Sequence, residues 1–168
     1  MGYSWACSRT SRTHLARNWG SIFFGMLSIL SDSNSSGREP GPIHYGSVDE
    51  FVREYLRNVY SRRIDGRHRV WAGRWWEHPE AVIRLDALWR SWEHLRHDAA
   101  TGMSVWWRDH ADHHIAVPMD SDGPFAEATD GEENLSKRGA PLPYVAPPAG
   151  MLPDERERAD ATDLDAAN

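Results

Sequence analysis

Apolar side chains recur at helical spacing soon after residue 45. They lie at Phe51, Tyr55, Leu56 and Val59, so that three or four positions separate Phe51 from Tyr55, and Tyr55 and Leu56 from Val59. This is the pattern of one buried face of an α-helix. Ser47 precedes the run and Glu50 follows three residues later, so the pair can form a capping box that satisfies free backbone N–H groups of the first turn. The pattern predicts a helix from Ser47 to about Arg62–Arg63, ended by an Asp65-Gly66 turn.

A second and longer periodic segment begins at His78-Pro79-Glu80. Proline suits the first position of a helix, where its missing N–H costs nothing, and a glutamate favours the positive helix end. A broad apolar stripe follows, at Ala81, Leu85, Leu88, Trp92 and Leu95. Such a stripe faces a core. We predict a helix from Pro79 to about His97–Asp98, with Leu88 in the core.

The segment after Gly102 contains aromatic and β-branched residues, which favour strands. We predict two short strands, Met103–Arg108 and His114–Val117, joined by a loop at Asp109–Asp112. Pro118 would end the second strand or mark it as an edge. The elements together predict a small α+β domain with two main helices and a short antiparallel β-hairpin. Seven of the nine tryptophans lie between residues 71 and 117, so we expect a tryptophan-rich core.

Composition changes sharply at both ends of this segment. We predict a disordered extension at 1–42, a globular domain at 43–127 with Phe125 packed on its core, and a disordered acidic, Pro/Ala-rich tail at 128–168. Basic residues followed by the short apolar run 22–30 leave two alternatives for the N-terminus. It could be a signal peptide, or translation could start at Met26.

Charge is distributed unevenly along the 168 residues, whose formal net charge is −6. Residues 43–97 carry ten arginines against eight acids, and residues 98–130 carry one arginine against seven. An acidic chain is not a general DNA-coating protein, although a local basic face would still bind phosphate. Cys7 is the single cysteine, which excludes an intramolecular disulfide and a cysteine-based zinc site.

Basic and aromatic residues alternate in the connection between the two helices. Arginine contacts phosphate and an aromatic ring stacks on a base, although arginine stems also cover tryptophan faces where no ligand binds. We expect a partner-binding face there and in the predicted hairpin. Its candidate residues are Arg67, Arg69, Trp71, Arg74, Trp75, Trp76, Trp106 and Arg108.

Histidines and aspartates cluster in the predicted hairpin loop. The candidate metal ligands are Asp109, His110, Asp112, His113 and His114, with His94 and Asp98 one helical turn apart as additional candidates. Imidazole nitrogens and carboxylates bind zinc, iron or manganese. The alternative is a polar loop in which these side chains bond to the backbone. His78 is a further candidate, either functional or simply capping the following helix. No motif for nucleophilic catalysis or nucleotide binding is present.

The segments YGSVDEFVREYL, WWEHPEA, LWRSWEHLR and WWRDHAD, between Tyr45 and Phe125, closely resemble an uncharacterised domain of unknown function from actinobacteria. That family is often encoded on plasmids, integrative elements and phage-like regions. The resemblance implies no activity, cofactor or catalytic residue, and it favours a cytoplasmic location.

These observations lead to two main hypotheses about function, beside a third possibility of a purely structural domain that only dimerises. The first is a non-enzymatic accessory or interaction module, a monomer or homodimer, that binds a protein partner or nucleic acid and neither a cofactor nor a membrane. The alternative is a metal-binding protein or metal-dependent enzyme that uses the Asp109–His114 cluster.

Overall fold

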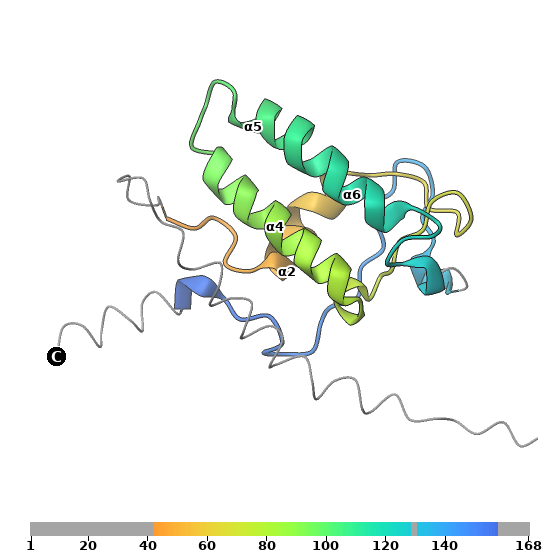
Figure 1. Cartoon of the computed structure of the whole chain (residues 1–168). Helices are drawn as coiled ribbons and strands as arrows, with labels where there is room; N and C mark the ends of the chain where they lie inside the picture. Colours follow the sequence, from red (N-terminus) through yellow and green to blue (C-terminus); the bar gives the residue numbers. More distant parts are fainter. Residues whose placement is uncertain (1–41, 129–130, 158–168) are drawn as a thin grey trace, which may run out of the picture. The chain divides into compact units, whose positions relative to one another are not determined.

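The computed structural model describes residues 42–128 and 131–157, and within these ranges the chain is helical (Figure 1). Its β-type pairing there is limited to one isolated antiparallel bridge, between Ile64 and Ser136. The predicted α+β class is therefore wrong. Within the same ranges no helix combines the length and apolar composition needed to cross a lipid bilayer. The predictions for residues 1–41 and 158–168 concern parts of the chain that lie outside the described residues.

The first helix is continuous through three segments: α2 (Val48–Glu50), the π-helical η1 (Phe51–Leu56) and α3 (Arg57–Val59). Ser47 caps it as predicted, because its Oγ accepts the Glu50 N–H at 3.2 Å. The Glu50 carboxylate accepts the N–H of Gly46 at 2.7 Å, one residue before the expected donor. Tyr60 leaves the helical conformation with φ −92° and ψ 54°, so the helix ends earlier than predicted.

The second helix is α4 (Pro79–Leu95), and a short 3₁₀ turn, η2 (Trp75–Glu77), precedes it. Pro79 occupies the first turn and Leu88 is fully buried, as predicted. The helix ends at Leu95, slightly before the predicted end. Its buried side carries Ala81, Val82, Leu85, Leu88, Trp89 and Trp92, the residues that packing against the neighbouring helices removes from water.

The predicted β-hairpin is a helix. Gly102 to Met119 form one continuous helix made of α5 (Gly102–Val105), the π-helical η3 (Trp106–Ala111) and α6 (Asp112–Met119). It runs beside α4, to which residues 96–101 connect it (Figure 1). The predicted strands and the Asp109–Asp112 loop are therefore corrected to successive turns of this α5–α6 helix.

The buried positions explain why a helix forms there. Trp106, Ala111, Ile115 and Met119 are all buried, at steps of five, four and four residues. In an α-helix five residues rotate about 140° beyond a full turn, so Trp106 and Ala111 would lie on different faces. The π-helical segment η3 is wider per turn and keeps both on the side that faces α4. Burial of this face outweighs the strand preference of valine and tryptophan.

A C-terminal strap, which we define as residues 131–157, lies against the helices. Leu142 is fully buried, and its N–H donates to the Arg57 carbonyl at 3.0 Å. The Tyr144 hydroxyl donates to Asp49 at 2.7 Å, and Val145 N–H donates to the Gly73 carbonyl at 2.8 Å. Phe125, just before the strap, is buried as predicted. The predicted domain of residues 43–127 leaves the strap out. The short 3₁₀ turn η4 (Ala126–Ala128) precedes the strap, and the 3₁₀ turn η5 (Glu132–Asn134) lies at its start.

We expect Gly102→Ala to lower the free energy of unfolding by roughly 1–3 kcal/mol, because the turn leaves no room for a side chain. A Cβ atom at this position would overlap the Leu95 carbonyl oxygen. Urea unfolding followed by tryptophan fluorescence measures the change. Ser104→Ala, at an exposed position of the same helix, should change stability by less than about 0.5 kcal/mol. Equal stability of the two variants would contradict the tight turn.

We expect the stabilisation by the Tyr144 hydroxyl to depend on pH in the alkaline range. Burial, together with the hydrogen bond to Asp49, raises the pKa of Tyr144 from 10.0 to about 12. The unfolded chain therefore releases this proton first, and stability is lost as pH rises between these two values. The difference in unfolding free energy between the wild type and Tyr144→Phe should be constant from about pH 7 to 9 and should shrink above about pH 10. A difference unchanged up to pH 12 would refute this.

Candidate functional site

The loop between the first helix and Trp71 is held at both of its ends by buried residues. Ile64 and Ser136 exchange two backbone hydrogen bonds of 3.2 Å each, and Val70 N–H donates to the Met119 carbonyl at 3.1 Å. Ile64 and Val70 are 2% and 1% exposed. The chain between these two anchors therefore has a fixed path while its other side chains remain in solvent.

Asp65 organises the turn between the anchors. Its carboxylate accepts the backbone N–H groups of Arg67, His68 and Arg69 at 3.1, 2.8 and 3.2 Å. These bonds hold the pKa of Asp65 far below its usual range, because they favour the ionised form. Gly66 adopts φ 70°, a conformation that favours glycine, as the predicted Asp65-Gly66 turn requires. The Asp65 negative charge is thus taken up by backbone donors.

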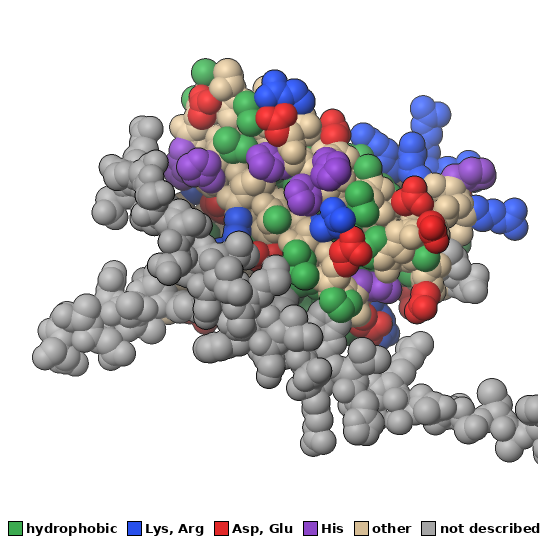
Figure 2. All heavy atoms as spheres, viewed as in Figure 1, with side chains coloured by type: hydrophobic (Ala, Val, Ile, Leu, Met, Phe, Trp, Pro, Cys, Tyr) green, Lys and Arg blue, Asp and Glu red, His purple; other side chains and the backbone are tan. Residues whose placement is uncertain are grey.

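Exposed basic side chains surround this turn. We call them the basic cluster: Arg62, Arg63, Arg67, Arg69, Lys137 and Arg138. Because the bridge at Ile64 and Ser136 is antiparallel, the residues after Ser136 run beside those before Ile64. Figure 2 shows Lys and Arg side chains gathered at the side where the yellow loop of Figure 1 lies.

The basic cluster differs from the other arginines in its lack of acidic partners. Within residues 42–128 and 131–157, none of its six members forms an ion pair. Every other exposed arginine of these ranges is paired with a carboxylate, namely Arg53, Arg74, Arg108 and Arg156. Positive charge that the protein itself leaves unneutralised is the property that attracts an anionic ligand.

Two partly exposed aromatic rings lie at one end of the basic cluster. Tyr60 and Trp107, which we call the aromatic platform, have ring centroids 6.0 Å apart and planes inclined by 17°. The Arg62 guanidinium lies 4.3 Å from the Tyr60 centroid, within cation–π range. The platform therefore continues directly into the basic cluster.

The eight residues predicted from the sequence to bind a partner lie in different environments in the structure. Arg67 and Arg69 belong to the basic cluster, whereas Arg74 and Arg108 are exposed but paired with Glu77 and Asp109 at 3.6 and 2.6 Å. Trp71, Trp75 and Trp106 are at most 1% exposed. Trp76 is half-buried and donates its indole N–H to the Val145 carbonyl at 3.1 Å. Most of these tryptophans thus belong to the core.

The candidate list from the sequence left out six residues that the fold brings to this surface. Tyr60, Arg62 and Arg63 belonged to the predicted first helix and its end. Trp107 belonged to a predicted strand, and Lys137 and Arg138 to the predicted tail. A signal for the last pair was present, because they are adjacent basic residues within an otherwise acidic, Pro-rich segment. Only the bridge between Ile64 and Ser136 brings them beside Arg62 and Arg63.

The candidate metal ligands lie on successive turns of the α5–α6 helix. Asp109 is bound by Arg108 at 2.6 and 2.8 Å, and the His113 and His114 rings are 5.7 Å apart and nearly perpendicular. Asp98 accepts the backbone N–H groups of Ala100 and Thr101. Figure 2 shows several histidines on the face over α4 and the α5–α6 helix. In the described part of the chain, no three His, Cys, Asp or Glu side chains are placed to hold a metal ion.

His78, the remaining candidate, lies immediately before α4. Its ring packs edge-on against Phe125 with centroids 5.1 Å apart. Its side chain makes no capping hydrogen bond to the helix. Burial lowers the pKa of His78, which keeps the imidazole neutral at physiological pH. This geometry indicates a packing role.

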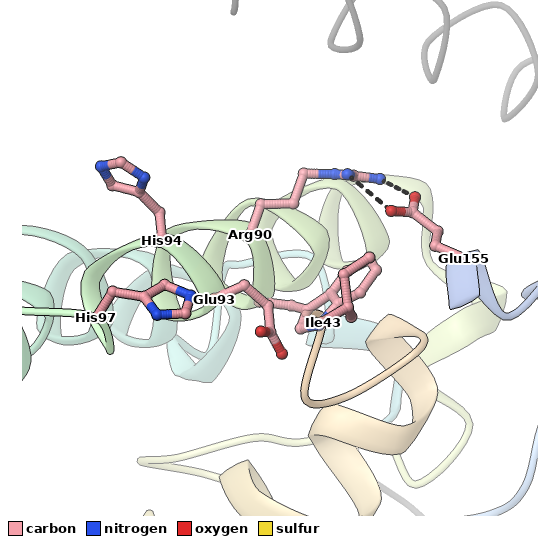
Figure 3. Close-up of a pocket in the computed structure, with 7 residues that line it drawn as sticks. Ile43, Arg90, Glu93, His94, His97 and Glu155 are labelled. Carbon is pink, nitrogen blue, oxygen red and sulfur yellow. Dashed lines mark hydrogen bonds and ion pairs between the residues drawn. The ribbon is translucent and has the colours of Figure 1, made fainter. Parts of the chain in front are cut away.

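A cavity of about 230 Å³ lies beside the second half of α4 (Figure 3). Arg90 extends along it and binds Glu155 at 2.6 Å and Asp86 at 2.9 Å. Glu93 accepts the Tyr45 N–H at 2.8 Å and an Arg96 guanidinium N–H at 2.8 Å. His94 and His97 lie at the other end in Figure 3. The ionic groups of this cavity are thus bonded to one another, which leaves little charge for a ligand.

Comparison with known proteins identifies a family. No curated protein and no solved structure matches the chain. A family model described as Domain of unknown function (DUF4913) matches residues 45–148. This confirms the resemblance to an uncharacterised domain and extends it into the strap as far as residue 148. Because the match covers more than half of the sequence, the chain belongs to the DUF4913 family.

Proposed function

We propose that this protein is an interaction module that binds nucleic acid through its basic cluster. The observation that supports this is the set of six exposed basic side chains without an acidic partner in the described ranges. Such a set offers several separate contacts to neighbouring phosphates. Each contact releases a condensed counterion, which is the main source of sequence-independent affinity.

The fixed backbone of the loop favours binding. Asp65 holds the N–H groups of three successive residues, and Ile64 and Val70 are anchored in the core. Binding a ligand therefore costs less conformational entropy than it would if the loop were flexible. The formal net charge of −6 repels polyanions from most of the surface. Binding would accordingly be local and would involve few phosphates.

Binding is favoured over catalysis by the chemistry of the basic cluster. Guanidinium and ammonium groups bind and orient anions, and a protonated guanidinium is a poor proton acceptor. An accessory role associated with mobile elements, which the family resemblance implies, remains a prediction, as does a protein partner. An acidic protein surface would compete for the same basic cluster, so the experiment has to distinguish it from nucleic acid.

We expect the double variant Arg67→Gln/Arg69→Gln to bind a fluorescein-labelled 20-base-pair duplex about tenfold more weakly than the wild type at 50 mM NaCl. Fluorescence anisotropy titrations between 50 and 200 mM NaCl give the salt dependence. The slope of log K against log[salt] should decrease in magnitude by about 1.8, because two phosphate contacts are removed at about 0.9 each.

Arg53→Gln is the matched control, since Arg53 is also an exposed arginine but is paired with Asp49 and Glu54. It should leave both the affinity and the slope unchanged. Poly-glutamate added at equal charge should not displace the duplex. The absence of salt-dependent binding, an equal loss in Arg53→Gln, or displacement by poly-glutamate would each refute nucleic-acid binding by the basic cluster.

A further inference from the structure

The aromatic platform is unlike the other tryptophan sites of the described chain. Four indole N–H groups donate to backbone carbonyls, those of Trp71, Trp76, Trp89 and Trp106. Trp75 and Trp92 are buried. Trp107 is partly exposed, and its indole N–H has no protein acceptor within the described ranges. The indole N–H groups of Trp75 and Trp92 have no partner either, but their rings are buried. Trp107 is therefore the one tryptophan of the described residues whose position neither burial nor an internal hydrogen bond explains.

The backbone directs Trp107 to the surface. Trp107 is the second residue of the π-helical segment η3, next to the fully buried Trp106. The two rings meet edge-on, with centroids 5.0 Å apart and planes inclined by 78°. Trp106 in turn is fixed by its hydrogen bond of 3.0 Å to the Leu88 carbonyl. Trp107 is thus held from behind by a rigid neighbour, and π-helical segments often occur at functional sites.

We infer that the ligand is single-stranded nucleic acid, with an unpaired base stacked on the platform of Tyr60 and Trp107 and the adjoining phosphates on the basic cluster. This rests on the proposed function. A base in a duplex is stacked on its neighbours and cannot reach a protein ring, whereas an unpaired base can. The platform would add affinity only for the single strand.

The path of the loop matches such a ligand. The loop starts at Tyr60, whose ring lies against Trp107, and ends at Val70, which bonds to Met119. These two contacts on the α5–α6 helix are twelve residues apart, or roughly 18 Å at about 1.5 Å per residue. A strand bound at the platform can therefore follow the basic cluster for several nucleotides. Arg62 belongs to the basic cluster and contacts Tyr60 of the aromatic platform, so it connects these two surfaces.

The test compares (dT)₂₀ with a 20-base-pair duplex in anisotropy titrations of the full chain. We expect the wild type to prefer (dT)₂₀. Trp107→Leu should weaken (dT)₂₀ binding by about 5- to 150-fold, the effect of losing one stacked base, and change duplex binding by less than twofold. Trp107→Phe should retain an intermediate affinity. Val59→Ala, at an exposed apolar position next to Tyr60, should change neither affinity.

Thermal melting checks that each variant is folded. If Trp107→Leu is unstable, Tyr60→Leu and Trp107→Phe are measured instead, with the same expected selective loss for (dT)₂₀. Equal loss on both ligands, or no loss on (dT)₂₀, overturns the single-strand inference. In that case the Arg67→Gln/Arg69→Gln variant, titrated in parallel, shows whether the basic cluster still binds nucleic acid. A wild type that binds neither ligand overturns both proposals.

Discussion

The fold depends on the burial of Trp106 between the first helix and α4. The ring is 0% exposed, lies edge-on to Phe51 and Tyr55 with centroids 6.2 and 6.0 Å away, and donates its indole N–H to the Leu88 carbonyl at 3.0 Å. A buried indole removes a large apolar area from water and carries one N–H donor that needs a hydrogen-bond acceptor. This single side chain therefore fixes both the distance between helices and the rotation of the α5–α6 helix about its axis.

The strap supplies hydrogen-bond acceptors for tryptophan side chains that the helices leave without one. Trp71 and Trp76 direct their indole N–H groups to the Pro143 and Val145 carbonyls at 2.8 and 3.1 Å. An irregular segment with few apolar side chains is thereby held through its backbone, because buried donors need acceptors and an extended chain offers carbonyls. The same segment brings Lys137 and Arg138 beside the Ile64 loop, so core packing and surface charge are linked by one stretch of chain.

Periodicity and capping predicted both helices that start with a clear N-terminal signal, at Ser47 and at Pro79. The α5–α6 helix lacks such a signal: Thr101 makes no side-chain cap, and the five-residue step from Trp106 to Ala111 breaks the α-helical pattern. Its sequence therefore resembled strands, and only tertiary packing decides otherwise. Part of the surface was foreseeable, since Arg67 and Arg69 stand in a visibly basic stretch. The contribution of Lys137 and Arg138, which follow Ser136, was not foreseeable, because it depends on a contact between residues 72 positions apart.

The π-helical segment η3 accommodates one residue more than an α-helical turn would hold between Trp106 and Ala111. A family member shorter by one residue at this point would form an ordinary turn there, with Ala111 and Ile115 still packed in phase with each other. Chain length at η3 can therefore vary at small cost to the core. Because Trp107 directly follows Trp106, such a deletion would leave this ring on the surface, and the change in length would be absorbed by the solvent-facing side of the turn.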